Sequence, residues 1–117
     1  MNILIVDDEQ LVRWFLERAL IRWGHKVISV SSAREAVTAL QEEEIDLMFT
    51  DLRMPEENGA ILVNKLSEIA TRKKPEVIIC SAYITNEMAE SFKKKGIKVL
   101  RKPFKLEELE VVLSQLA

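Results

Sequence analysis

Five side chains of types used in phosphoryl chemistry stand at widely separated points of the sequence: Asp7, Asp8, Asp51, Ser81 and Lys102. If the fold brings the three carboxylates to one edge, each pair about 4 Å apart repels by about 1 kcal/mol in water and about 4 kcal/mol at an intermediate dielectric. A hard divalent cation relieves that repulsion, and carboxylate oxygens with water suit Mg²⁺ or Mn²⁺ better than zinc. The residues therefore predict a magnesium or manganese site.

Lys102 would add a positive charge and Ser81 a hydroxyl donor, a pair that suits a tetrahedral oxyanion. Phosphoryl transfer uses such groups because its transition state spreads negative charge over the equatorial oxygens. The sequence contains no P-loop motif, and its three glycines form no glycine-rich cradle for a nucleotide. A carboxylate can itself accept the phosphoryl group as an acyl phosphate, and Asp51 is the natural candidate.

The elements that must position these residues follow from the hydrophobic pattern. Short apolar runs rich in branched residues alternate with longer amphipathic stretches, which is typical of strand-helix units around a parallel sheet. The predicted strands cover residues 3–6, 26–30, 45–50, 77–80 and 99–100. The predicted helices cover residues 9–23, 33–40, 58–69, 85–95 and 106–116.

Local signals set several helix ends. Gly24 and Gly96 are expected just beyond the first and fourth helices, where a C′ glycine is common. Ser31 or Ser32 is expected to cap the second helix, with Glu35 at capping-box distance from Ser32. The apolar residues expected to recur along the first helix are Leu11, Phe15, Ala19 and Trp23.

Continuous apolar strands imply burial on both faces, so the predicted fold class is α/β, a doubly wound five-stranded parallel sheet with helices on both sides. In such sheets ligands bind beyond the carboxyl ends of the strands. The acidic pair follows the first strand, Asp51 the third, Ser81 the fourth and Lys102 the fifth. All five are therefore expected at one edge.

Composition limits the class of protein. The 117 residues, 48% hydrophobic and 31% charged, predict one globular domain over residues 1–117. A formal charge of -2 gives no reason to expect direct nucleic-acid binding. Cys80 is the single cysteine, which excludes an internal disulfide and favours a reducing cytoplasm. Without a leader-like start or a long apolar run, a soluble protein with no membrane partner is expected.

The four motifs, taken in order, resemble the receiver domains of response regulators in two-component signalling, the CheY-like family. They are Asp7-Asp8, the segment of residues 51–59 with Met54-Pro55 and Gly59, Ser81-Ala82, and Lys102-Pro103-Phe104. The resemblance covers the chain from Asn2 to about Leu116. It implies a flavodoxin-like (βα)5 fold with strand order 2-1-3-4-5.

The resemblance also implies roles. Asp8 and Asp51 would ligate Mg²⁺ directly, Asp7 largely through water, and Arg53 through its backbone carbonyl. Asp51 would be the phosphoacceptor, Ser81 would hydrogen-bond the phosphoryl group, and Lys102 would pair with Asp51 or a phosphoryl oxygen. A cis peptide is implied between Lys102 and Pro103.

In this interpretation the chain is a phosphoacceptor signalling domain and not an enzyme that acts on outside substrates. The implied phosphodonor is a histidine kinase or histidine phosphotransfer protein. The implied output is a domain or protein docking on the face formed by the fourth helix, fifth strand and fifth helix. Basic residues gather there: Lys93, Lys94, Lys95, Lys98, Arg101 and Lys105.

Two departures from the family pattern concern switching. The expected switch positions are Ser81 and Val99, but the family often has an aromatic residue where Val99 stands, and the segment from Gly96 to Lys102 is one residue short. The resemblance therefore does not extend to switching by an aromatic side chain at this position. Arg53 and Tyr83 would flank the path of an attacking water, which suggests a long-lived phosphoryl group.

The same residues also allow other functional interpretations. Asp7-Asp8 could simply cap the first helix. A phosphohydrolase of the haloacid dehalogenase type would need an acid at position 53, where Arg53 stands. A flavodoxin-like carrier would need a flavin phosphate loop after the first strand. A pseudo-receiver would only bind partners, which the intact Asp51, Ser81 and Lys102 argue against.

Overall fold

A computed structural model describes residues 1–52, 62–63, 68 and 70–116. Five strands form one parallel sheet: β1 (Asn2–Val6), β2 (Lys26–Val30), β3 (Leu47–Thr50), β4 (Glu76–Ser81) and β5 (Lys98–Arg101). Their order is β2-β1-β3-β4-β5. The predicted α/β class and strand order are therefore confirmed.

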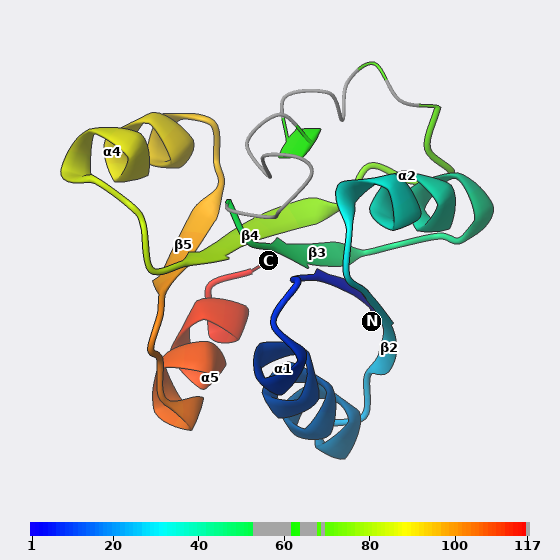
Figure 1. Ribbon diagram of the computed structural model, residues 1–117, viewed down its shortest axis with the longest axis horizontal. Helices are drawn as coiled ribbons and strands as arrows, with labels where there is room; N and C mark the ends of the chain where they lie inside the picture. The colour runs from blue at the N-terminus through cyan, green and yellow to red at the C-terminus, as the bar shows by residue number, and fades with distance from the viewer. Residues whose placement is uncertain (53–61, 64–67, 69, 117) are drawn as a thin grey trace.

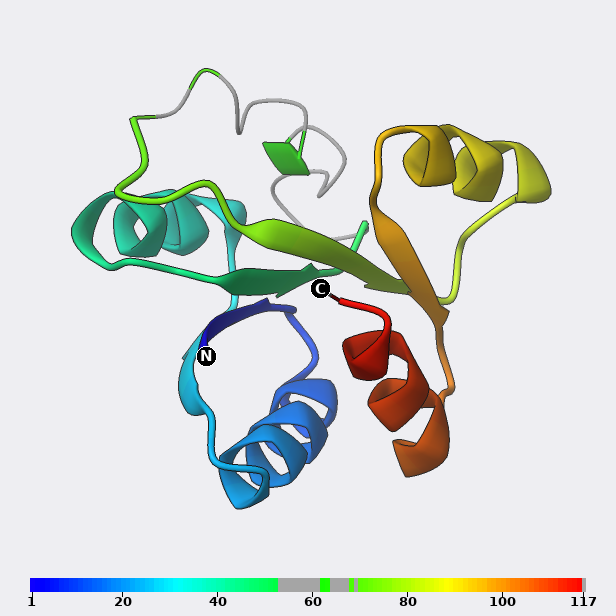
Figure 2. The same ribbon diagram turned by 180° about the vertical axis from the view of Figure 1, so that it is seen from behind.

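Helices cover both faces of the sheet (Figures 1 and 2). The described helices are α1 (Gln10–Arg22), α2 (Ala33–Glu42), α4 (Asn86–Lys94) and α5 (Leu106–Ser114). α1 and α5 lie against one face of the sheet, and α2 and α4 lie against the other. The helix predicted over residues 58–69 falls largely outside the described residues, although Leu62 and Val63 are described and buried.

The helix ends predicted at Ser32, Gly24 and Gly96 are confirmed, and Thr85, predicted as the first residue of a helix, is the N-cap of α4. The Ser32 Oγ accepts a hydrogen bond from the Glu35 N–H at 3.2 Å and caps α2. The Thr85 Oγ1 accepts from the Met88 N–H at 3.1 Å and caps α4. Gly24 and Gly96 have φ angles of 89° and 75°, values that favour glycine after a helix.

Two apolar clusters pack on the two faces of the sheet. One joins β-strand residues to α2 and α4, and the other joins them to α1 and α5. β1 and β3 alternate between the clusters: Leu4 and Met48 belong to the first, and Ile5 and Phe49 to the second. Burial on both faces explains why these strands read as continuous apolar runs.

The face predicted for the first helix is partly wrong. Leu11 is 76% exposed and Phe15 39% exposed, whereas Leu16, Ala19 and Leu20 are buried against the sheet. α1 carries apolar side chains around most of its circumference, so spacing alone does not single out the buried stripe.

Strand ends also differ from the prediction by one or two residues. β3 starts at Leu47, and just before it the Asp46 side chain accepts a hydrogen bond from the Asn2 N–H at 2.7 Å. β4 extends to Ser81 and β5 to Arg101, and these two residues are paired in register. The peptide between Lys102 and Pro103 is cis, as predicted. Among the described residues, no helix is long and apolar enough to span a membrane.

Candidate functional site

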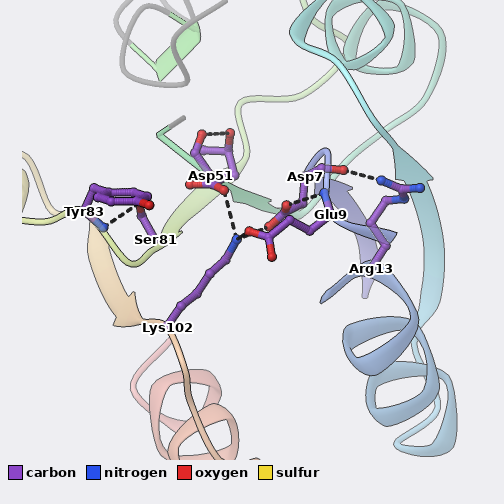
Figure 3. A network of polar contacts seen from close by, with 8 residues as sticks. Asp7, Glu9, Arg13, Asp51, Ser81, Tyr83 and Lys102 are labelled. Carbon is purple, nitrogen blue, oxygen red and sulfur yellow. Dashed lines mark hydrogen bonds and ion pairs between the residues drawn. The ribbon is translucent and has the colours of Figure 1, made fainter. Parts of the chain in front are cut away.

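The predicted site residues converge at the carboxyl edge of the sheet, and Figure 3 shows four of them, Asp7, Asp51, Ser81 and Lys102. Asp7 and Asp51 directly follow β1 and β3, and Ser81 ends β4. All three are buried, and Lys102 follows β5. Asp8 lies beside Asp7 but is exposed. Four neighbouring strand ends thus bring together residues almost a hundred positions apart.

Lys102 is the cation at the centre of this edge. Its Nζ lies 2.8 Å from the Asp7 Oδ2, 2.9 Å from the Asp51 Oδ2 and 2.9 Å from the Glu9 Oε1 (Figure 3). The Lys102 side chain is only 9% exposed. Burial acts to lower the pKa of Lys102, but hydrogen bonds to the carboxylates outweigh it and raise that pKa above its ordinary value. Lys102 is therefore firmly charged.

Asp7 is held from several sides. Its N–H donates to the Val30 carbonyl at 3.2 Å, its Oδ1 accepts from the Glu9 N–H at 2.9 Å, and its carbonyl accepts from the Arg13 guanidinium. Burial raises the pKa of Asp7, and this effect outweighs both the attraction of the nearby Lys102 ammonium and the hydrogen bond from the Glu9 backbone. One ammonium does not fully compensate the buried charge.

Asp51 and Ser81 are fixed through the backbone of the strands beside them. The Asp51 N–H donates to the Val6 carbonyl at 3.0 Å, continuing the contact between β3 and β1. The Ser81 carbonyl accepts from the Lys102 N–H at 3.0 Å, and its Oγ accepts from the Tyr83 N–H at 3.1 Å. In this contact the Ser81 Oγ acts only as an acceptor, so the contact does not use the Ser81 hydroxyl hydrogen.

The donor set fits a hard divalent cation. Carboxylate oxygens of Asp7, Asp8, Glu9 and Asp51 all lie within 4.8 Å of one another. The Asp7 Oδ2 is buried and, despite its short distance to Lys102, lacks a partner with hydrogen-bond geometry among the described residues. An all-oxygen set with a spare buried lone pair suits Mg²⁺ or Mn²⁺. Arg53, the predicted carbonyl ligand, lies outside the described residues.

Sequence reasoning missed Glu9. It was assigned only to the start of the first helix, yet its carboxylate reaches Lys102 and joins the acidic group. The available signal was its position directly after Asp7 and Asp8, at a helix N-terminus that faces the site. Residue type alone did not separate this role from ordinary helix capping.

Comparisons with known proteins agree with the fold and with the geometry of the site. A model of the response regulator receiver domain family matches residues 3–114. This chain belongs to that family. Its receiver fold also resembles that of the chemotaxis response regulator CheY4 of Vibrio cholerae, with a TM-score of 0.87 and 25% identity, over 99% of this chain and 98% of that one.

Longer signalling proteins contain similar segments. The sensory/regulatory protein RpfC of Xanthomonas campestris pv. campestris is 32% identical over 100% of this chain and 16% of its own length. The sensory transduction protein LytR of Streptococcus agalactiae is 31% identical over 98% of this chain and 47% of its own length. The receiver domain thus spans less than half of either relative.

The predicted switch positions lie on neighbouring strands. Val99 is half-buried on β5 and packs against the cluster that contains Ile84 and Phe92. Two residues later, the Arg101 guanidinium donates to the Ile84 carbonyl in the connection between β4 and α4. β5 therefore contacts the connection between β4 and α4 in two ways, through the apolar packing of Val99 and through the hydrogen bond of Arg101.

Proposed function

We propose that this receiver domain accepts a phosphoryl group on Asp51 from a histidine kinase or histidine phosphotransfer protein, in a reaction that requires Mg²⁺. The observation that carries the proposal is the position of the buried Asp51 carboxylate. Its Oδ2 lies 2.9 Å from Lys102, within the acidic group that fits a divalent cation. We regard the domain as a signalling phosphoacceptor that catalyses only its own modification.

The chemistry is an in-line transfer. A carboxylate oxygen of Asp51 forms a bond to phosphorus while the bond from phosphorus to the donor nitrogen breaks. The departing nitrogen keeps the electron pair of that bond, and the other ring nitrogen carries a proton taken from solvent, so the donor leaves as a neutral imidazole. Asp7, Asp8 and Asp51 would hold Mg²⁺, which would supply positive charge to stabilise the phosphoryl oxygens. Lys102 offers a second positive charge, and the Ser81 hydroxyl donates to a phosphoryl oxygen on the product.

A protein phosphodonor would approach over a groove beside Lys102. The groove is lined by Glu9, Leu11, Val12, Phe15, Ala82, Tyr83, Lys102, Pro103 and Phe104. Phe15 and Phe104 meet edge to face, with ring centroids 5.6 Å apart. The exposed Leu11 and Tyr83 leave apolar surface next to the phosphoacceptor, which suits a partner that must also align its own histidine.

The output side of the proposal concerns α4, β5 and α5. Lys93, Lys94, Lys95, Arg101 and Lys105 are exposed there, so a domain or protein with an acidic surface would fit. Lys93 and Lys94 also lie in the last turn of α4, where positive charge stabilises a helix. We also propose that the protein is located in a reducing cytoplasm. Its single cysteine, Cys80, is buried, and burial raises the pKa of the Cys80 thiol, which is compatible with that location.

The direct test is labelling with a small phosphodonor. The protein is incubated with Mg²⁺ and acetyl phosphate or phosphoramidate, and intact mass spectrometry counts phosphoryl groups. We expect one adduct, stable in acid and labile in base, that is absent in Asp51→Asn and absent when the metal is chelated. A protein that takes up no phosphoryl group would be a binding module, and turnover of a phosphate ester would make it a hydrolase.

A further inference from the structure

The side chain of Glu9 reaches away from its own helix. Glu9 is the N-cap residue of α1 and has an extended backbone, yet its side chain makes no cap hydrogen bond. N-cap side chains normally accept from amides of the first turn, and this stabilises the helix. The Glu9 Oε1 instead lies 2.9 Å from the Lys102 Nζ (Figure 3). The carboxylate is therefore used at the site rather than at the helix end.

The backbone of Glu9 is anchored while its carboxylate is exposed. The Glu9 N–H donates to the Asp7 Oδ1 at 2.9 Å, and the Glu9 carbonyl accepts from the Arg13 N–H at 3.1 Å. The Glu9 side chain is 58% exposed, whereas those of Asp7 and Asp51 are almost fully buried. Of the three carboxylates on Lys102, only that of Glu9 has room to follow a moving ammonium.

A divalent cation would change the contacts of Lys102. Mg²⁺ among Asp7, Asp8 and Asp51 would attract the same oxygens that hold the Lys102 ammonium, and the two cations would repel each other. An ammonium has three donors, which face three carboxylates in this structure. When two of those carboxylates turn to a metal, Glu9 remains as the partner at the mouth of the site.

We propose that Glu9 is a positioning residue for Lys102. It holds the ammonium at the mouth of the site while Mg²⁺ occupies the Asp7, Asp8 and Asp51 carboxylates, so that Nζ stays within reach of a phosphoryl oxygen on Asp51. The inference rests on the proposed function, because it assumes that the cation binds at this acidic group. It assigns to Glu9 a role different from direct metal ligation.

A double-mutant cycle tests this role with Mg²⁺ alone as the probe. Calorimetric titration compares the parent, Glu9→Gln, Lys102→Met and the double variant, with Glu43→Gln as a charge-matched control beyond the end of α2, away from the site. We expect Glu9→Gln to weaken Mg²⁺ binding by about two- to fivefold, the range for an exposed ion pair. In the Lys102→Met background its effect should shrink to that of Glu43→Gln.

Two results would overturn the role. Equal weakening in both backgrounds would mean that Glu9 acts on the metal directly, and no weakening in either would mean that it does not hold Lys102. Because Lys102→Met can impair folding, the ammonium signal of Lys102 is also followed by NMR in Mg²⁺-saturated protein. It should move in Glu9→Gln and not in Glu43→Gln, and an unchanged signal contradicts the proposal.

Failure of this inference can be told apart from failure of the proposed function. If Asp51 accepted a phosphoryl group but the effect of Glu9→Gln did not depend on Lys102, the function would stand and the role of Glu9 would fall. If the dependence on Lys102 were found but Asp51 remained unlabelled, the positioning of Lys102 by Glu9 would stand and the phosphoacceptor function would fall.

Discussion

Replacement of Lys102 by Met should destabilise the metal-free domain strongly at neutral pH. The ammonium is the shared partner of two buried carboxylates, those of Asp7 and Asp51, at 2.8 and 2.9 Å. Breaking a buried pair by removing one partner costs about 3–5 kcal/mol because an uncompensated charge stays buried. Against a typical stability of about 5–15 kcal/mol, the Lys102→Met variant should remain folded but only marginally stable.

The pH dependence of the Lys102→Met variant has a definite sign. Burial already raises the pKa of Asp7 above its unfolded value, and loss of Lys102 removes an interaction that lowers it. The folded variant then binds more protons than the unfolded chain, so its stability increases as pH falls through the raised pKa of Asp7. Saturating Mg²⁺ should also restore stability, by about 2.7 kcal/mol at a hundred times the dissociation constant.

Urea unfolding followed by far-UV circular dichroism measures this effect at about pH 7.5 and at a pH near the ordinary carboxyl pKa of about 4, each with and without Mg²⁺. Lys73→Met is the matched control, because Lys73 pairs with Asp46 at the exposed surface, where loss of an ion pair changes stability little. Two results would refute the charge argument. One is that Lys102→Met lowers the free energy of unfolding by less than about 1 kcal/mol, and the other is that the decrease is the same at both pH values and unaffected by Mg²⁺.

Three further outcomes are expected. Asp8→Asn should weaken Mg²⁺ binding by at least about tenfold, measured by calorimetry, while leaving metal-free stability within about 0.5 kcal/mol because Asp8 is exposed. Tyr83→Ala should shorten the half-life of phosphorylated protein, since Tyr83 is an exposed side chain two residues after Ser81; an unchanged half-life would contradict shielding from water. Leu11→Glu should slow transfer from a phosphotransfer protein but not labelling by acetyl phosphate, and equal slowing of both would contradict docking on the groove.

The positions of the site residues could be predicted from the sequence because they follow from topology. In a doubly wound sheet the carboxyl ends of parallel strands share one edge, so Asp7, Asp51, Ser81 and Lys102 had to meet once their strands were recognised. The strands themselves were recognisable because burial on both faces gives continuous apolar runs.

Other features depend on information that the pattern does not hold. Leu11 and Phe15 on α1 are as apolar as its buried residues, and only tertiary packing decides which side faces the sheet. Glu9 has the type and position of an ordinary residue at a helix start, and only the three-dimensional approach of Lys102 shows its other use. The length of β5 depends on pairing with β4 rather than on its own propensity.

The electrostatics of the site explain why the carboxylates sit at strand ends. Four carboxylates and one ammonium leave a net negative charge, and the raised pKa of Asp7 shows that Lys102 does not compensate it fully. The carboxylates in this group repel one another, so they must be held in place by parts of the fold that are stable without them. The backbone of Asp51 is bonded to β1, and that of Lys102 to Ser81 at the end of β4. The buried sheet thus supplies the stability, and the unbalanced charge at its edge favours a divalent cation.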